Sequence, residues 1–453
     1  MSNFLFNEFE DISASAWKQK IQVDLKGADY NDNLLWHTND GITVKPFYHK
    51  DTDNATTAIT NTSWKIAQLI DVSATAESNQ KALEAIERGA ESIVFVIHTE
   101  LIIAELLTKI DTNTVEIQFK FKLLNRKMAE ETMQLNLPKC YLNIDIIGHL
   151  AQTGNWYNSL KDDFSFIKSL VKKYPEQNIL SIDTSVYQNA GATITQQLAY
   201  ALAHVNEYFN NFKDGSLPHI QFITATSGNY FFEIAKIRAL KLLFKTLSEN
   251  YNSNQLTCNT LSFPSNRNKT IYDYNVNLLR TTTECMSVIL GGANTVCNLP
   301  YDYIYHNAND FGDRIARNQL LILKEESAFN AVNNPSDGSY YIETLTQQLA
   351  ENALDIFKSI EAGGGILAQL KEGIIQRKIK ESGLKEQEQF DNGSLVLLGT
   401  NKHPNAEDKM KHDLEKQPFV NHESRKTLIA PITARRISEK SDKNRLEQEQ
   451  NHN

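Results

Sequence analysis

Eight short apolar segments, each followed by an amphipathic segment, occupy the middle of the chain and constrain its fold more than any other feature. The apolar segments are predicted strands at 66–72, 91–97, 114–121, 140–147, 179–183, 219–225, 255–263 and 294–299. Helical patterns lie near 79–90, 100–110, 125–135, 158–174, 193–212, 229–251, 272–290 and 309–328. In the fifth of these, apolar side chains recur at steps of three and four: Ile194, Leu198, Leu202, Val205, Phe209 and Phe212.

This strict alternation predicts a parallel sheet, because two parallel strands must be joined by a crossover segment, usually a helix. Eight strand–helix units in about 260 residues are the size of a closed (β/α)8 TIM barrel, which we place at 66–330. An open doubly wound sheet would show the same alternation. The barrel is favoured because its strands are short, mostly apolar and covered by helices.

Three further regions flank the predicted barrel. Residues 1–65 are rich in aromatic side chains and are expected to form an N-terminal arm or cap that contacts another subunit. Residues 331–403 form a helical extension: one strong helix at 338–365, a second near 366–381 and a short strand and turn at 393–401. Residues 404–453 are a polar tail of mixed charge, whose last dozen residues are expected to be disordered.

The composition is that of an ordinary globular protein and narrows the classes of function. Hydrophobic residues make up 41% and charged residues 22% of the chain, so a large core can form. The net charge is -9 and there is no basic stripe, which argues against a nucleic-acid partner. The four cysteines form no C-x-x-C pair, and we find neither a signal peptide nor an apolar run of eighteen residues. These features predict a cytoplasmic protein with no membrane contact.

A TIM barrel places its active site at the carboxyl ends of the strands. The polar or flanking residues predicted there are Asp71, His98, Thr99, Glu100, Asp183, Ser185, Tyr187, Thr224, Thr226, Ser227, Leu261, Ser262, Phe263, Asn298 and Tyr301. In a functional interpretation, His98 is a general acid or base with Asp183 as its partner. The alternatives, which we favour, are that His98 and Glu100 begin a helix and that Asp183 braces a loop.

Other catalytic patterns are missing from the sequence. There is no H-E-x-x-H motif or His/Cys cluster for a metal, no phosphate-binding glycine loop and no G-x-S-x-G elbow. The pair Gly291-Gly292 follows a helical pattern instead of preceding one, so it is predicted to end that helix. The residues alone therefore indicate a barrel without a convincing catalytic set.

Several long stretches resemble a known family. They are AGATITQQLAYALAHVNEYF (190–209), FFEIAKIRALKLLF (231–244), LLRTTTECMSVILGGANTVCNLPYD (278–302), the segment 313–365 and LLGTNKHPN (397–405). They are similar to the barrel domain of methylmalonyl-CoA mutase, over roughly residues 25–440. The family pattern DPxGGSYYxExLT reads NPSDGSYYIETLT here, with Asn334 and Asp337 as departures.

The resemblance implies an activity for the family. Its active members use adenosylcobalamin to interconvert methylmalonyl-CoA and succinyl-CoA by a radical rearrangement, with coenzyme A threaded along the barrel axis. A separate C-terminal domain binds cobalamin through a D-x-H-x-x-G motif. This motif does not occur in the sequence, so no cofactor or metal site is expected on this chain.

The positions that match the family's catalytic residues are substituted. Active subunits carry Tyr-His where this chain has Ser185 and Val186. Active strand seven resembles H-T-Q-T-S-G, whereas this chain has Leu261 and Phe263, whose apolar side chains would share one face and fill the barrel axis. The R-x-S pattern of strand six is replaced by 219–221, which reads HIQ. A site that loses polar donors cannot stabilise a reacting thioester.

The resemblance therefore implies a non-catalytic small, or beta, subunit of a heterodimeric mutase. Its partner would be the large, or alpha, subunit, which would hold the acyl-CoA substrate and the adenosylcobalamin. One alternative is the catalytic barrel subunit of a split acyl-CoA mutase that uses a separate cobalamin-binding chain. A second is an unrelated barrel enzyme that uses Asp183, Tyr187 or His98.

Overall fold

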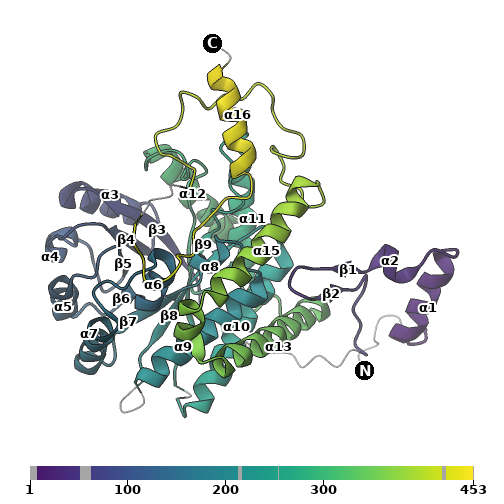
Figure 1. The fold of residues 1–453 in the computed structure, drawn as a ribbon, viewed down its shortest axis with the longest axis horizontal. Coiled ribbons are helices and arrows are strands. Elements are labelled where there is room, and N and C mark those ends of the chain that lie inside the picture. Colours follow the sequence, from purple (N-terminus) through teal and green to yellow (C-terminus); the bar gives the residue numbers. More distant parts are fainter. Residues whose placement is uncertain (1–7, 52–62, 213–216, 254, 421–424, 452–453) are drawn as a thin grey trace.

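Eight parallel strands close into a barrel, which confirms the prediction of a TIM barrel over an open sheet (Figure 1). The computed structural model describes residues 8–51, 63–212, 217–253, 255–420 and 425–451. In the barrel, the neighbours run in the order β10-β3-β4-β5-β6-β7-β8-β9, with β10 paired to β3. The strands are β3 Lys65–Val72, β4 Ser92–Ile97, β5 Glu116–Phe121, β6 Cys140–Ile144, β7 Asn178–Asp183, β8 Ile220–Thr226, β9 Asn259–Pro264 and β10 Thr295–Cys297.

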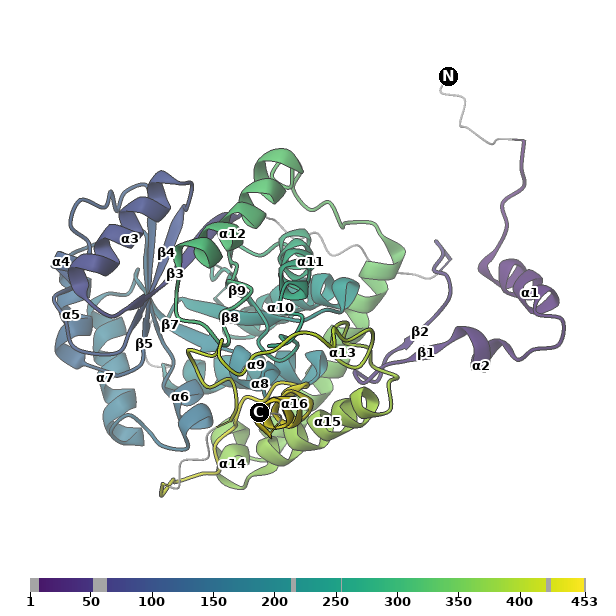
Figure 2. The same cartoon turned by 90° about the horizontal axis from the view of Figure 1, so that it is seen from above.

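Helices surround the strands and cover their outer faces (Figure 2). Every residue of β4 and β8 is buried, as expected for parallel strands that are covered on both sides. The surrounding helices are α3 Thr75–Glu87, α4 Ile103–Leu106, α5 Arg126–Gln134, α7 Leu160–Lys173, α9 Ile194–Asn211, α10 Tyr230–Asn250, α11 Val276–Leu290 and α12 Asp310–Leu321, which continues as the π-helix η1 Ile322–Glu326. Gly291 caps the C-terminus of α11, so the glycine pair ends that helix as predicted.

Two short helices that the sequence analysis did not predict lie at the carboxyl ends of strands. The fourth strand was predicted to reach residue 147, but β6 ends at Ile144 and the helix α6 Ile146–Thr153 begins. Asp145 caps this helix by accepting a hydrogen bond from the backbone N–H of Gly148 at 2.8 Å. The helix α8 Ser185–Gln188 follows β7 in the same way. An apolar run such as Ile146-Ile147 fits a buried strand or a buried helix equally well, and the cap decides between them.

The C-terminal extension is helical and packs against the barrel helices. It contains α13 Tyr340–Ala362, α14 Gly365–Lys371 and α15 Ile374–Asp391. The predicted single helix at 366–381 is thus two helices, because Gly373 adopts a φ of 72° and breaks the path. Residues 393–401 form a turn, with one isolated bridge between Leu398 and Lys402, instead of the predicted strand.

The N-terminal arm stands away from the barrel in both views (Figures 1 and 2). It comprises α1 Ala14–Asp24, α2 Tyr30–Leu34 and the hairpin of β1 Trp36–His37 and β2 Thr43–Val44. The hairpin turn holds the arm to the body, since the backbone N–H of Thr195 donates to Asp40 at 2.8 Å. Helix α1 has no buried residue, and Trp17 and Trp36 are about half exposed.

The polar tail lies on the barrel and ends in a helix. We expected its last dozen residues to be disordered, but Glu439–Asn451 form α16, in which Asp442 and Leu446 are buried. The sequence misleads here because α16 is almost entirely polar and is held by a few buried tertiary contacts instead of an apolar stripe. Among the described residues, none of the helices has the length and apolar character needed to cross a bilayer.

Candidate functional site at the barrel mouth

The floor of the barrel is closed by a polar network centred on Glu116 of β5. Its carboxylate lies 2.5 Å from the Nζ of Lys65 and accepts hydrogen bonds from Ser92, Gln118 and Thr295 at 3.1, 2.7 and 3.0 Å. The donors come from β3, β4, β5 and β10, so one buried anion joins half of the strands. The charge of Glu116 is thus compensated within the barrel.

Above this network, an apolar cluster fills part of the axis. Most of its buried members lie on β3, β4, β8, β9 and β10, and the last lies two residues after β10. They are Ala67, Val94, Ile223, Leu261, Phe263, Cys297 and Leu299. Strand alternation directs these side chains inward, while their neighbours on the same strands pack against the helices. Leu261 is completely buried and Phe263 is 8% exposed.

Ser185 and Val186, at the positions that match the family's Tyr-His pair, lie on α8 directly after β7. The hydroxyl and the backbone N–H of Ser185 both donate to Oδ1 of Asp183. Val186 is buried in the main hydrophobic core, between the strands and the helices. Neither side chain can therefore act as an acid or base at the mouth.

Asp183 is paired with Lys120 of β5, and not with His98 as the functional interpretation proposed. The Nζ of Lys120 lies 2.7 Å from Oδ2 of Asp183. Burial raises the pKa of Asp183, but the charge of Lys120 and the hydrogen bonds outweigh it, so the pKa is lower than usual. A carboxylate held in its charged form in this way is a poor general acid.

His98 pairs with a different carboxylate, Asp71 at the end of β3. Its Nε2 lies 3.1 Å from Oδ1 of Asp71, and both side chains are well exposed. The prediction that His98 and Glu100 begin a helix is also wrong, because α4 starts at Ile103. His98 and Glu100 lie in the loop between β4 and α4, which is open to solvent.

Tyr187, the third candidate, is completely buried behind β7. Its hydroxyl lies 2.6 Å from Nε2 of His204, and Asp145 lies 4.0 Å from the other ring nitrogen. Burial raises the pKa of Tyr187 well above its usual value and lowers that of His204. The sequence analysis missed His204 because it sits inside the apolar stripe of α9. This group resembles a catalytic relay, but no atom of Tyr187 or His204 is accessible to a substrate.

Four further polar side chains of the mouth are engaged in internal hydrogen bonds, whereas Oγ1 of Thr226 is buried without a hydrogen-bond partner. Thr224 and Ser262 share a bond of 2.8 Å, Ser227 donates to Glu233 at 2.8 Å, and Asn298 donates to the backbone of Ala316 at 3.0 Å. These side chains hold the strand ends and helices together.

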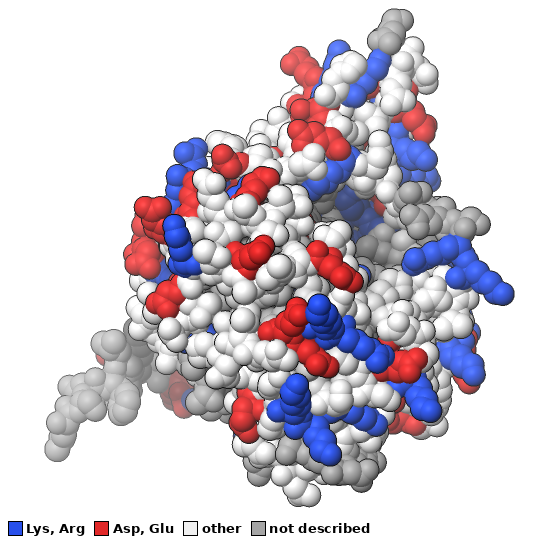
Figure 3. Space-filling model, turned by 90° about the vertical axis from the view of Figure 1, so that its left-hand side faces the viewer, with Lys and Arg blue, Asp and Glu red and all other residues white. Residues whose placement is uncertain are grey.

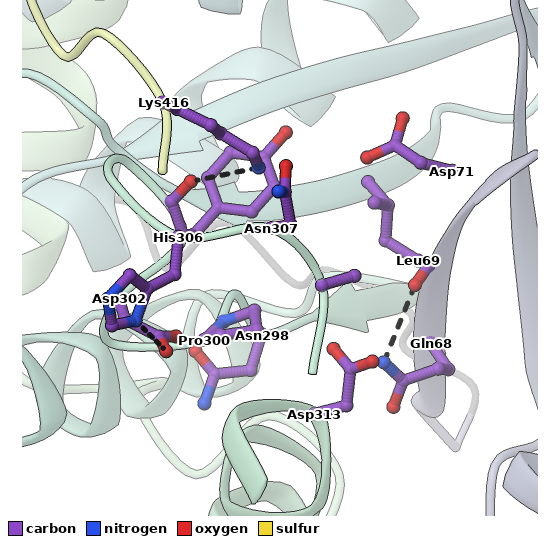
Figure 4. Close-up of a pocket in the computed structure, with 12 residues that line it drawn as sticks. Gln68, Leu69, Asp71, Asn298, Pro300, Asp302, His306, Asn307, Asp313 and Lys416 are labelled. Carbon is purple, nitrogen blue, oxygen red and sulfur yellow. Dashed lines mark hydrogen bonds and ion pairs between the residues drawn. The ribbon is translucent and has the colours of Figure 1, made fainter. Parts of the chain in front are cut away.

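A narrow cleft opens beside the axis, between the end of β3 and the loop after β10 (Figure 4); its volume is about 380 Å³ when the adjoining open solvent is included. Its polar lining includes Asp71, Asn298, Asp302, His306, Asp313 and Lys416. Burial raises the pKa of Asp313 to about 6. His306 donates toward Asp302 at 3.1 Å, and Lys416 reaches in from the tail. Among the described residues, no group of three or more His, Cys, Asp or Glu side chains is arranged to hold a metal ion.

Comparison with known proteins identifies the family. The family model for methylmalonyl-CoA mutase matches residues 105–451 of the 453. The chain belongs to the methylmalonyl-CoA mutase family. It is 33% identical to the methylmalonyl-CoA mutase small subunit of Porphyromonas gingivalis, over 88% of this chain and 71% of that protein.

Two proteins of Streptomyces virginiae, a small and a large subunit, are similar to this chain. The methylmalonyl-CoA mutase small subunit is 26% identical over 88% of this chain and 71% of that protein. The large subunit is 32% identical, over 51% of this chain and 33% of that protein. Members of the mutase family thus include a small and a large subunit in one organism, and the family is in general dependent on adenosylcobalamin.

The described residues of the mouth do not fit that cofactor or an acyl-CoA chain. Leu261, Phe263 and their neighbours fill part of the axis, and Lys120 and Asp183 neutralise each other at its rim. The tail also bonds to the loops around the mouth, with Arg435 donating from its backbone to Asn189.

Proposed function

We propose that this chain is the non-catalytic small subunit of a heterodimeric methylmalonyl-CoA mutase. The large subunit carries out the interconversion of methylmalonyl-CoA and succinyl-CoA, and this chain stabilises it. The observation that carries the proposal is the filled barrel: Leu261 and Phe263 occupy the space where an acyl-CoA chain would thread.

The state of the mouth supports the same role. Ser185 and Val186 supply no group that polarises a thioester, and the carboxylate of Asp183 is neutralised by Lys120. An active site needs donors aimed at the charge that develops in the transition state. Here the donors point at other protein groups.

The adenosylcobalamin of the complex then belongs to the large subunit, together with the acyl-CoA. The small and large subunits found in Streptomyces virginiae support a pairing of this kind. The four cysteines are free thiols, which supports a reducing compartment, so we place the complex in the cytoplasm without nucleic-acid or membrane contacts.

The N-terminal arm is the surface that we assign to the large subunit. Phe9, Trp17 and Val23 expose apolar area on a segment that stands off the body. Exposed apolar groups in such number are typical of a protein–protein contact. By contrast, the face of the body formed around α3 to α7 carries positive and negative side chains side by side (Figure 3).

The pairing is tested by light scattering after size exclusion, with this chain alone and mixed with the large subunit from the same organism. A one-to-one complex that carries a single adenosylcobalamin is expected. No complex, or mutase activity from this chain with a free cobalamin-binding protein, would favour the split catalytic mutase instead.

The arm is tested with Trp17→Ser and Val23→Ser in one variant. We expect the affinity for the large subunit to fall at least about tenfold, since buried apolar anchors dominate most interfaces. Leu135→Ser is the control, because Leu135 is an exposed apolar residue at the end of α5, on the side away from the arm. Unchanged pairing of the arm variant would refute this assignment.

A further inference from the structure

His306, in the loop after β10, is hydrogen-bonded through both nitrogens of its ring. Nδ1 lies 3.1 Å from a carboxylate oxygen of Asp302, which belongs to the same loop. Nε2 lies 2.9 Å from the backbone carbonyl of Asp413 in the C-terminal tail, and 3.4 Å from Oδ1 of that residue. Ionised carboxylates and carbonyls only accept hydrogen bonds, so both ring nitrogens have to donate. Only the charged imidazolium, which has a proton on each nitrogen, satisfies this geometry.

The neutral ring cannot keep both of these bonds. A neutral histidine has a proton on one nitrogen and a lone pair on the other. Whichever tautomer forms, one lone pair then faces an oxygen atom of Asp302 or Asp413. Loss of the proton therefore breaks one half of the link between the loop and the tail, and it also removes the attraction between the ring and the two aspartates.

The surroundings of His306 favour the charged ring. The charged groups that contact it or line the same cleft come from β3, the loop after β10, α12 and the tail: Asp71, Asp302, Asp313, Asp413 and Lys416. All of them except Lys416 are acidic. Burial lowers the pKa of His306, but the hydrogen bond to Asp302 and the charge of Asp413 outweigh it, so that the pKa is raised.

The tail segment 410–416, which we call the docking segment, lies on the loop after β10. The backbone N–H groups of Glu415 and Lys416 both donate to the carbonyl of Tyr305 at 2.9 Å. In return, the backbone N–H of Asn307 donates to the carboxylate of Glu415 at 2.7 Å. The segment also places Lys416 in the wall of the side cleft (Figure 4). These backbone amides report directly on whether the segment is docked.

We propose that His306 is a pH-dependent latch for the docking segment. With a charged ring, the segment is docked and Lys416 forms part of the cleft wall. When the ring loses its proton, the segment opens more often, which withdraws Lys416 and leaves the carboxylates of the cleft facing solvent. The barrel stays folded in both states. This proposal concerns contacts within the chain and is independent of the proposed function.

Hydrogen exchange on the full chain, at pH 6 and at pH 8, tests the latch in the parent and in His306→Gln. Because the two proteins are compared at the same pH, the intrinsic pH dependence of exchange cancels. At pH 6 the amides of Asn307, Glu415 and Lys416 should exchange at least about threefold faster in the variant, since one amide nitrogen cannot reach both acceptors of the ring.

At pH 8 this difference should shrink, because a group with a raised folded pKa stabilises the docked state below its unfolded pKa and stops doing so as the pH rises through the folded value. The same ratio of exchange rates at both pH values, or no difference at either, would overturn the proposal. Loss of protection in β4 and β8 of the parent over this pH range would also overturn it, because the opening would then not be local.

Two further variants separate titration from a purely structural role. His412→Gln is the matched control, because His412 is an exposed histidine next to Asp413, and it should exchange like the parent. Asp413→Asn keeps the backbone carbonyl but removes a negative charge beside the ring. It should therefore move the loss of protection to lower pH, whereas a pH profile that superimposes on that of the parent would contradict the latch.

Nuclear magnetic resonance of the chain with ¹³C-labelled histidine follows the ring itself. The signal that is missing from His306→Gln identifies the residue. Its titration midpoint should lie above the ordinary histidine value of about 6.5. A midpoint below that value would show that the ring is neutral in the docked state and would overturn the proposal.

Discussion

The Nζ of Lys120 lies 2.7 Å from Oδ2 of Asp183 at the rim of a barrel whose axis is partly filled by an apolar cluster. The two residues come from β5 and β7, which are separated by β6 in the barrel. Their pairing neutralises the only carboxylate that directly ends β7, and it leaves Ser185 as a brace for Asp183. These side chains at the mouth thus stabilise the fold by bonding to one another.

Lys120→Met should destabilise the fold by about 2–4 kcal/mol at neutral pH, because it leaves a mostly buried carboxylate without its cation. The free energy of unfolding in urea measures this loss. Lys127→Met removes an exposed partner of Glu131 and should change stability by less than about 0.5 kcal/mol. An equal effect of the two substitutions would contradict the role given to Lys120.

The pH dependence of the same variant tests the charge of Asp183. The pKa of Asp183 is lowered in the folded chain, so its stabilising contribution is present above the unfolded pKa and is lost as the pH falls through the folded value. The parent should therefore lose more stability than Lys120→Met on acidification below about pH 4. Parallel pH profiles would show that the pairing does not shift this pKa.

Leu261→Ala should cost about 2–5 kcal/mol, since it opens a cavity in the apolar cluster on the barrel axis. Leu279→Ala is a control at a side chain that is 67% exposed, and it should change stability little. Calorimetry with and without acyl-CoA completes the test. Tight acyl-CoA binding by the parent chain would contradict a filled axis.

His306 links the loop after β10 to the C-terminal tail, through Asp302 at 3.1 Å and the carbonyl of Asp413 at 2.9 Å. Burial lowers the pKa of His306, but the hydrogen bond to Asp302 and the charge of Asp413 outweigh it and raise the pKa. The stability that His306 contributes to the fold is therefore fully present below a pH of about 6.5, and it is lost as the pH rises through the folded pKa.

The expected result is that the parent loses stability relative to His306→Gln as the pH is raised from 6 to 8. Urea unfolding at several pH values measures this difference. His403→Gln, at an exposed histidine just before the C-terminal tail, should follow the parent. A constant difference between the parent and His306→Gln over this range would exclude the titration of His306.

Asp337, one of the two departures from the family pattern, has a structural role. Its carboxylate lies 2.5 Å from the guanidinium of Arg238, which is buried on α10 and also contacts Glu343 of α13 at 2.6 Å. Asp337→Gly restores the family residue and should cost about 1–3 kcal/mol through the lost charge-assisted hydrogen bond. Asp355→Ala is the control. Asp355→Gly would not serve, because residue 355 lies within the helix α13. A neutral Asp337→Gly would mean that Glu343 alone satisfies Arg238.

The sequence by itself determined the eight strand–helix units and favoured the closed barrel, because apolar periodicity is local and eight such units leave few ways to bury eight strands. Segments such as 193–212 and 229–251 are helices close to their predicted limits. The stretches that carry the family resemblance also needed no tertiary structure, since they are read along the chain.

Only the tertiary structure decided which polar groups meet. Sequence order could not pair Asp183 with Lys120 instead of His98, because that choice depends on which strands are neighbours and which faces point inward. It also could not show that Glu439–Asn451 is a helix or that the backbone of the tail bonds to the loops after several barrel strands. Those features depend on Arg436, Asp442 and backbone carbonyls far away in the chain, and contacts of that kind leave no periodic signal in the sequence.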